Sequence, residues 1–432
     1  MPQATRVIGA VDDPVSPGLL SASVVILGPT MAVTPAAATL TAPSRRVAAD
    51  RLAPAPSWTR SLRVALVAYG ALRLGALLVA VIAGQVDLGK ALTDPIRLFL
   101  PFLHLDAVWQ VDIAAAGYQP YTAVPIAGHT YDGAAFLPAF PGLMHGLAAL
   151  TGLSPYGAGL LLCAAAAAAG LAMLHRLALE DHGPRVATLA VVLTVAFPTA
   201  VYLCSAYTEC LLLPEFAGAF LCVRRGRTGW AAVLAAAATV TKVYAVILVV
   251  PLAVEVVQAR RADRPGQVRG LVTLGAGALA GVVALAAFYL HEFGQPLRFI
   301  TAQVNWDHAF SAPWVGVQRA LETIVHPDAA GADQALAALQ LAVVALLGWA
   351  TVYAWRELRP SYAAFLGLSL CAFITNGLLV SITRYALAVF PLAIVLAHWA
   401  SSSTTRVRRL VTAAVPVSVG VTWLFVSGHF TG

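Results

Sequence analysis

Long apolar runs separated by short arginine clusters recur along most of this chain. A helix needs about 20 predominantly apolar residues to cross the hydrocarbon core of a bilayer. Hydrophobic residues make up 59% of the 432 residues and charged residues only 11%, against about 25% in soluble domains. The chain is therefore predicted to be all-α and to be a polytopic integral membrane protein. The apolar runs cover residues 64–84, 155–174, 185–205, the stretch between Glu209 and Arg224, and residues 230–257, 270–290, 335–353, 362–380, 385–399 and 411–426.

The arginine clusters set the expected orientation, because cytoplasmic loops carry an excess of Lys and Arg. Five arginines between positions 45 and 63 precede the first run and place the N-terminus in the cytoplasm. Residues 1–57 are predicted to form a disordered cytoplasmic tail, and residues 58–432 one domain of about eleven transmembrane or re-entrant helices. Two larger loops, 85–135 and 291–333, then face the outside of the plasma membrane, and residues 136–150 form a helix at the outer membrane face.

The apolar run 230–257 has basic clusters at both ends, so a single crossing would put one cluster outside. The polar break at Thr239, Thr241 and Lys242 predicts a re-entrant hairpin with both ends cytoplasmic. Irregular backbone at membrane depth is tolerated only where protein or a cavity covers it. A charged residue there is a functional candidate; the alternative is a lysine that snorkels or pairs with Glu209 or Glu215.

The first outer loop carries a carboxylate in a helical pattern. Asp106, Trp109 and Ile113 share one face, and a carboxylate held there outside the membrane can act as a general base. A solvated loop aspartate or a helix N-cap is the alternative, which composition alone favours. Asp112 lies six residues further on, off the face of Asp106.

The second outer loop combines an aromatic and polar residues. Trp306 suits sugar stacking or an interfacial anchor. Asp307 and His308 are potential metal ligands, but two ligands do not make a site.

The chain contains four sequence elements in this order: Asp106-x-x-Trp109-x-x-x-Ile113-Ala-x-x-Gly-Tyr118 with Ala135-Phe-x-Pro-x-Phe-Pro141, then Phe197-Pro198 with Tyr207-Thr208-Glu209, Ala235 to Thr241-Lys242, and Ser381-x-x-Arg384-Tyr385 with Phe390-Pro391. These elements resemble motifs of the PIG-V family of mannosyltransferases, GT-C-fold enzymes whose eukaryotic members are the GPI mannosyltransferase II enzymes. Together they cover roughly residues 60–400. The chain departs from the family's pattern at His104-Leu105-Asp106, where Arg-Trp-Asp is usual, at Lys242 in place of Arg, and at Gln119 in place of an acidic residue.

The resemblance implies a GT-C-type fold and the inverting transfer of a hexose, with mannose expected, from a polyprenyl-phosphate-sugar donor to a glycolipid or glycoprotein acceptor at the outer face. It implies Asp106 as the general base and Lys242 and Arg384 as donor phosphate-binding residues. No metal or other cofactor is expected. The Ala- and Arg-rich composition implies a bacterial relative acting on the cell envelope. The expected substrate-binding residues are His104, Trp109, Asp112, Tyr118, Tyr207, Glu209, Trp306, Asp307, His308 and Tyr385.

Two other classes of function remain open at this point. A flippase or transporter of lipid-linked sugars would need charges along a path through the bilayer, whereas here they gather at the outer ends of the runs, which favours an enzyme. A noncatalytic scaffold would need neither Asp106 nor Lys242. No basic stripe interleaved with aromatic residues is present, so nucleic acid is not an expected partner. The expected partners are membrane lipid, the polyprenyl-phosphate-sugar donor and the acceptor.

Overall fold

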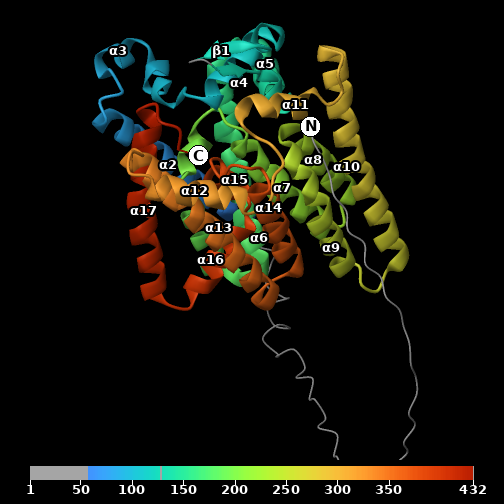
Figure 1. Cartoon of the computed structure of the whole chain (residues 1–432). Helices are drawn as coiled ribbons and strands as arrows, with labels where there is room; N and C mark the ends of the chain where they lie inside the picture. The colour runs from blue at the N-terminus through green and yellow to red at the C-terminus, as the bar shows by residue number, and fades with distance from the viewer. Residues whose placement is uncertain (1–56, 127–128, 432) are drawn as a thin grey trace, which may run out of the picture. The chain divides into compact units, whose positions relative to one another are not determined.

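The computed structural model describes residues 57–126 and 129–431, and helices make up almost all of this part (Figure 1). The sheet among these residues has two strands, β1 (Val124–Ile126) and β2 (His129–Tyr131), paired antiparallel. This confirms the all-α prediction. Apart from Ser57, the predicted cytoplasmic tail lies outside the described residues.

Five described helices are long and apolar enough to cross a membrane. They are α2 (Trp58–Ile82), α6 (Pro155–Val195), α10 (Arg264–Phe293), α13 (Gly331–Glu357) and α17 (Thr404–Val426). A sixth candidate consists of α15 (Ile382–Ala388) and α16 (Pro391–Ser401), which meet at a bend of 78°.

The predicted count of about eleven segments is not confirmed, because several predicted crossings are short or interrupted. Helix α7 (Glu209–Arg224) has 16 residues and contains Pro214 and Glu215. Helices α8 (Thr228–Thr241), α9 (Val249–Ala259) and α14 (Pro360–Ile374) have 14, 11 and 15 residues.

Helix α6 holds two of the predicted crossings, separated by a kink. Gly183 has φ 81° and ψ 179°, a conformation that glycine adopts without steric cost, and Pro184 follows it. The second half then returns toward the start of the helix. The sulfur of Cys163 in the first half lies 3.0 Å from the carbonyl oxygen of Ser205, which follows the second half.

The predicted break and hairpin shape are present in the structure, and the cytoplasmic placement of both ends stays a prediction. Helix α8 ends at Thr241, Lys242 is extended, and the 3-10 helix η7 (Val243–Leu248) leads into α9. Arg224 at the end of α7 binds Glu255 near the end of α9, with 2.7 Å between Nε and Oε1. The chain therefore enters and leaves the hairpin at the same level of the bundle.

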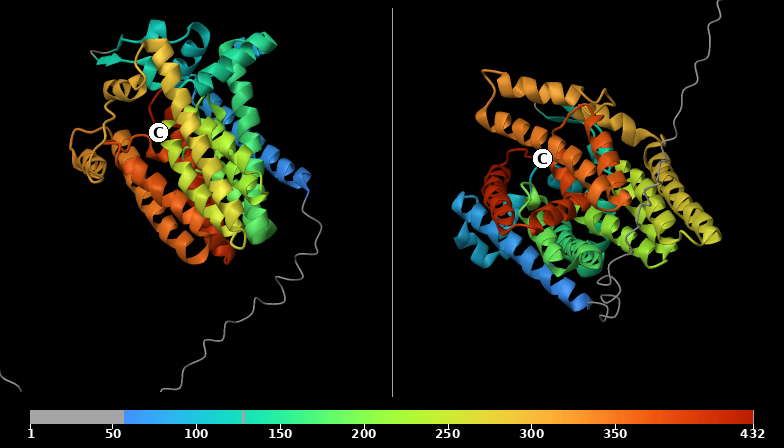
Figure 2. Two further views of the ribbon diagram at one scale, coloured as in Figure 1. Left: turned by 90° about the vertical axis from the view of Figure 1, so that its right-hand side faces the viewer. Right: turned by 90° about the horizontal axis from the view of Figure 1, so that it is seen from below.

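The two polar loops pack against each other at the end of the bundle opposite this ion pair (Figures 1 and 2). The indole nitrogen of Trp306 donates to the carbonyl of Asp132 over 3.0 Å, and Arg298 forms an ion pair with the Asp132 carboxylate. Helix α5, the outer-face helix expected at 136–150, packs beside α4. The loop elements are α3 (Leu88–Thr93), η2 (Pro95–Leu98), η3 (Leu100–Phe102), α4 (Asp106–Ala116), η4 (Gln119–Tyr121), η5 (Gly133–Ala135), α11 (Arg298–Gln303), η8 (Val304–Trp306) and α12 (Val315–Val325); α5 is Ala139–Thr151, and η6 (Ala200–Cys204) precedes α7.

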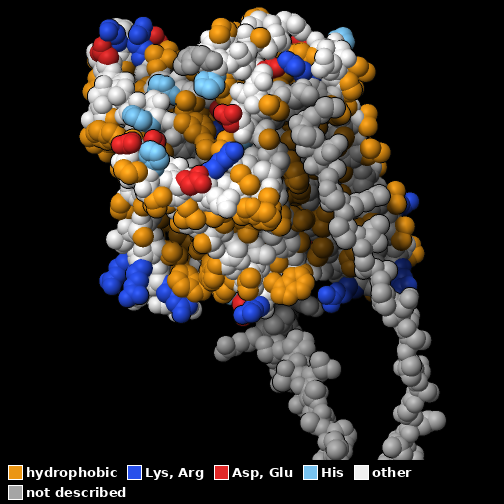
Figure 3. All heavy atoms as spheres, viewed as in Figure 1, with side chains coloured by type: hydrophobic (Ala, Val, Ile, Leu, Met, Phe, Trp, Pro, Cys, Tyr) orange, Lys and Arg blue, Asp and Glu red, His pale blue; other side chains and the backbone are white. Residues whose placement is uncertain are grey.

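Charge is segregated along the bundle. Figure 3 shows basic side chains along the lower edge and hydrophobic side chains across the middle. The segments that join α7 to α8, α9 to α10, α13 to α14 and α16 to α17, with the adjoining helix ends, carry basic residues: Arg224, Arg225, Arg227, Arg260, Arg261, Arg264, Arg356, Arg359, Arg406, Arg408 and Arg409.

Candidate active site

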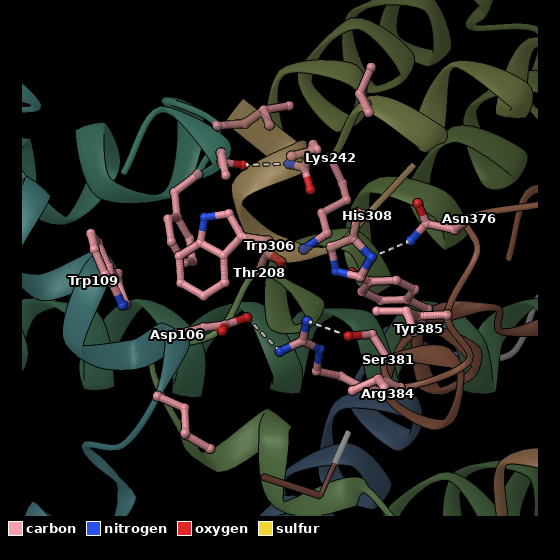
Figure 4. Close-up of a pocket in the computed structure, with 18 of the residues that line it drawn as sticks. Asp106, Trp109, Thr208, Lys242, Trp306, His308, Asn376, Ser381, Arg384 and Tyr385 are labelled. Atoms are coloured by element: carbon pink, nitrogen blue, oxygen red, sulfur yellow. Dashed lines mark hydrogen bonds and ion pairs between the residues drawn. The ribbon is translucent and has the colours of Figure 1, made fainter. Parts of the chain in front are cut away.

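A cavity of about 670 Å³ lies beneath the two packed loops, where α4, the tip of the α8–α9 hairpin and the segment around α15 meet (Figure 4). This volume is in the range of small-molecule sites, roughly 300–1,000 Å³. The cavity unites predicted site residues from four distant parts of the chain. They are Asp106, Trp109, Lys242, Trp306, Asp307, His308, Arg384 and Tyr385.

Asp106 is the first residue of α4, where the helix dipole favours a negative charge. The preceding Leu105 has φ 56°, and so does Asp307 across the cavity. Among the described residues, these are the two that have positive φ without being glycine, and both line the cavity. Such conformations cost about 1–3 kcal/mol each and cluster at functional sites.

Arg384 lies beneath the cavity between two carboxylates. Its Nη1 is 2.6 Å from Oδ2 of Asp106, and its Nε is 3.1 Å from Oε1 of Glu209. The Arg384 side chain is 2% exposed, that of Glu209 is 0% exposed and that of Asp106 is 19% exposed. Asp106 is thus the member of this group that substrates can reach. Four aromatic rings surround the guanidinium with centroids 5.2–5.8 Å away: Tyr202, Tyr207, Tyr385 and Phe430.

Lys242 supplies a second cation, from the tip of the hairpin. Its Nζ lies 4.9 Å from the centroid of the Tyr385 ring, a cation–π distance. Within the part of the chain that the structure describes, no carboxylate forms an ion pair with Lys242. Its charge is therefore available to an anionic ligand, whereas that of Arg384 is compensated by two carboxylates.

His308 lies beside Lys242 in Figure 4. Burial lowers the pKa of His308, and the positive charges of Lys242 and Arg384 lower this pKa further. The amide nitrogen of Asn376 donates to Nδ1 over 3.0 Å. Both effects favour the neutral form of His308.

An aromatic wall stands opposite the cations. Trp306 contacts Trp109, Tyr131 and Phe136, with centroid distances of 5.4, 4.7 and 5.3 Å. Trp109 also stacks on Phe136 at 5.8 Å. Flat faces of this kind suit the apolar face of a sugar ring.

The other predicted site residues are not among the residues that line the cavity. Tyr207 donates to the carbonyl of His104 over 3.2 Å, and Tyr118 donates to the carbonyl of Phe136 over 2.8 Å. Both tyrosines thereby hold the backbone next to lining residues. Asp112 is half-buried on α4, which raises its pKa. Glu209 forms an ion pair with Arg384, and its expected contact with a substrate stays a prediction.

Sequence reasoning missed several lining residues, among them Tyr244, Gln303, Asn376, Ser381 and Phe430. A turn signal was present in Asn376-Gly377. Gly377 has φ 76°, and a Cβ there would lie 2.9 Å from the Ala309 carbonyl oxygen. The loop that presents Asn376 therefore packs closely on the loop that presents His308. The sequence around Phe430 contains no comparable turn signal that would indicate its place at the cavity.

No group of three or more His, Cys, Asp or Glu side chains is placed to hold a metal ion within residues 57–126 and 129–431. The Asp307–His308 pair has no third ligand of these types among them.

Comparisons with known proteins bear on this site. Residues 134–381, more than half of the chain, match glycosyltransferase family 87. This range contains Lys242 and His308 but begins after Asp106 and ends before Arg384. The comparison with curated proteins found no match.

Two solved structures of ArnT from Cupriavidus metallidurans are similar to the chain, each at 14% identity over 74% of this chain and 72% of that one. The TM-score is 0.32 for ArnT bound to undecaprenyl phosphate and 0.29 for its apo state. None of these findings names the PIG-V family, so that assignment is not confirmed. By the family match, the chain belongs to glycosyltransferase family 87.

Proposed function

We propose that this protein transfers a hexose, with mannose expected, from a polyprenyl-phosphate-linked donor to a glycolipid or glycoprotein acceptor. Membership of a glycosyltransferase family supports sugar transfer. The observation that carries the proposal is that one cavity holds a reachable carboxylate, Asp106, and a cation without a carboxylate partner among the described residues, Lys242. In this proposal the fold is of the GT-C type, the basic end of the bundle faces the cytoplasm of a bacterial cell, and the cavity opens to the outside.

The proposed reaction is a single displacement with inversion. The acceptor hydroxyl oxygen attacks the anomeric carbon and its proton passes to Asp106. The bond between this carbon and the phosphate oxygen breaks, and the polyprenyl phosphate leaves with the bonding electrons. A fixed cation stabilises the charge that develops on the leaving oxygen.

Arg384 and Lys242, the two cations expected at the donor phosphate, have different neighbours, and we propose different roles for them. Arg384 is already held by two carboxylates, so we assign it to fixing Asp106. Lys242 is the better candidate for the phosphate. The aromatic wall of Trp109 and Trp306 would hold a sugar ring opposite.

Lys242→Ala is expected to lower kcat/KM for the donor by about 10- to 100-fold, the loss of one charge-assisted hydrogen bond of roughly 1.5–3 kcal/mol. Lys242→Arg should keep most activity because either cation can bind a phosphate. Transfer at limiting donor concentration measures both. Wild-type activity of Lys242→Ala would remove this residue from the site.

Activity is expected to survive exhaustive chelation of divalent metals. Side-chain cations can stabilise the leaving polyprenyl phosphate, a phosphomonoester, without a metal ion. Transfer measured before and after chelation, with each metal added back, tests this. Complete loss that one divalent metal restores would contradict it and would point to Asp106, Asp112 or Asp307 as ligands.

The acceptor can be identified in cells. Envelope glycolipids and glycoproteins should lose one hexose in a deletion strain, and the wild-type gene should restore it while Asp106→Asn should not. Unchanged sugar composition in the deletion strain would contradict a transferase. Accumulation of the intact lipid-linked sugar on the cytoplasmic side alone would indicate a flippase instead.

A further inference from the structure

Glu209 is a buried carboxylate that the proposed reaction does not use directly. It is the first residue of α7, is 0% exposed, and lies behind Arg384 as seen from the cavity. Its ionic partner among the described residues is Arg384. Neither of its carboxylate oxygens accepts a well-aligned hydrogen bond from these residues. Burying a charge in this way is costly unless an opposite charge compensates it.

Arg384 connects this carboxylate to the reactive one. The guanidinium is planar and rigid, so its nitrogens have a fixed relation to each other. Nε lies 3.1 Å from Oε1 of Glu209, Nη1 binds Asp106, and Nη2 binds the hydroxyl of Ser381 over 3.3 Å. The last two contacts are drawn in Figure 4. A shift of the guanidinium toward or away from Glu209 would therefore displace the Asp106 carboxylate.

We propose that Glu209 is a positioning residue that acts on Asp106 through Arg384 and keeps Asp106 basic enough to accept the acceptor's proton. This inference rests on the proposed function. With one carboxylate, the whole charge of Arg384 would stabilise the ionised form of Asp106 and make it a weaker base. With two carboxylates, the same positive charge is shared between Asp106 and Glu209.

The groups around Asp106 come from several elements. Arg384 forms ion pairs with both Asp106 and Glu209, and Lys242 lines the same cavity as Asp106. Tyr202, Tyr207 and the neutral form of His308 add polar rather than charged neighbours. Removing the charge of Glu209 would therefore leave the whole positive charge of Arg384 to Asp106. Arg384, Tyr202, Tyr207 and His308 are close enough to Asp106 to interact with its charge, Glu209 contacts Arg384, and Lys242 and Asp307 line the same cavity.

Glu209→Gln tests the inference, because Gln has the same shape without the charge. The acid limb of the pH profile of kcat should move to lower pH by about one unit, the equivalent of 1.36 kcal/mol. The kcat at neutral pH should fall severalfold, since a weaker base transfers protons less well. The KM values for donor and acceptor should stay the same, because Glu209 does not reach the cavity.

Two further variants distinguish the effect of losing the Glu209 charge from an effect on the packing of α7. Glu209→Asp keeps the charge and should leave the acid limb close to its wild-type position even if kcat falls. Glu215→Gln removes another buried carboxylate of α7, which binds Thr241 over 3.0 Å and not Arg384. It should leave the acid limb in place.

A wild-type acid limb for folded Glu209→Gln would overturn the inference. If that variant does not fold, an acid limb displaced to lower pH in Glu209→Asp would overturn it, since this variant retains the charge. Either result, combined with inactive Asp106→Asn, would leave the proposed function standing. Wild-type turnover of Asp106→Asn would instead remove the proposed base and, with it, the role assigned to Glu209.

Discussion

Asp106→Asn is expected to lose about a hundred- to ten-thousand-fold in sugar transfer, the usual contribution of a general base. A sugar hydroxyl is a weak nucleophile, and its proton must leave as the new bond forms. Asn keeps the shape of Asp106 and can still contact Arg384, but it cannot accept this proton. The loss should fall on kcat, with expression and donor affinity retained.

Asp112→Asn is the matched control, since both carboxylates lie on α4 but Asp112 is not among the residues that line the cavity. Its transfer rate should stay within a few-fold of wild type. Both rates are measured with labelled donor and purified variants in detergent. Near-wild-type turnover of Asp106→Asn would exclude it as the base, and an inactive Asp112→Asn would move the base to that residue.

Arg384→Ala is expected to abolish transfer and to destabilise the fold. It leaves Glu209 buried without its ionic partner and Asp106 without the group that orients it. Removing one partner of a buried ion pair typically costs about 3–5 kcal/mol. Thermal denaturation in detergent measures the stability of the variant, and labelled transfer measures its activity.

Arg384→Lys distinguishes charge from geometry. An ammonium cannot reproduce the planar fork that meets two carboxylates at once. The loss of one charge-assisted hydrogen bond, roughly 1.5–3 kcal/mol, should lower transfer by about 10- to 100-fold, with better stability than in Arg384→Ala. The exposed Arg406→Ala is the control and should match wild type. A stable, active Arg384→Ala would contradict the role of Arg384.

The features of this protein that could be predicted from the sequence are those that the order of apolar runs and basic flanks determines in a membrane. Basic flanks on both sides of residues 230–257, with Lys242 near the middle, allow a hairpin and disfavour a single crossing, and the structure has that hairpin. The total number of spans was harder to predict. Apolar runs such as that of α7 contain Pro214 and Glu215, and hydropathy alone does not show that the resulting short helix packs inside the bundle.

Several individual residues that line the cavity could be predicted from the sequence, but their arrangement in space could not. The sequence singled out Asp106, Lys242, Arg384 and His308, and the structure places all four around one cavity. The ion pair between Asp106 and Arg384 joins residues 278 positions apart, so no local pattern indicates it. The same holds for Glu209, whose role depends on the residue that the tertiary fold places against it.

The most direct test of the proposed function is sugar transfer by the purified protein reconstituted in lipid vesicles, with a synthetic polyprenyl-phosphate-linked hexose as donor and extracted envelope lipid as acceptor. We expect labelled hexose on the acceptor, one polyprenyl phosphate released for each hexose transferred, and no transfer from a nucleotide sugar. Transfer from a nucleotide sugar alone, or movement of the intact lipid-linked sugar between leaflets without release of polyprenyl phosphate, would contradict it.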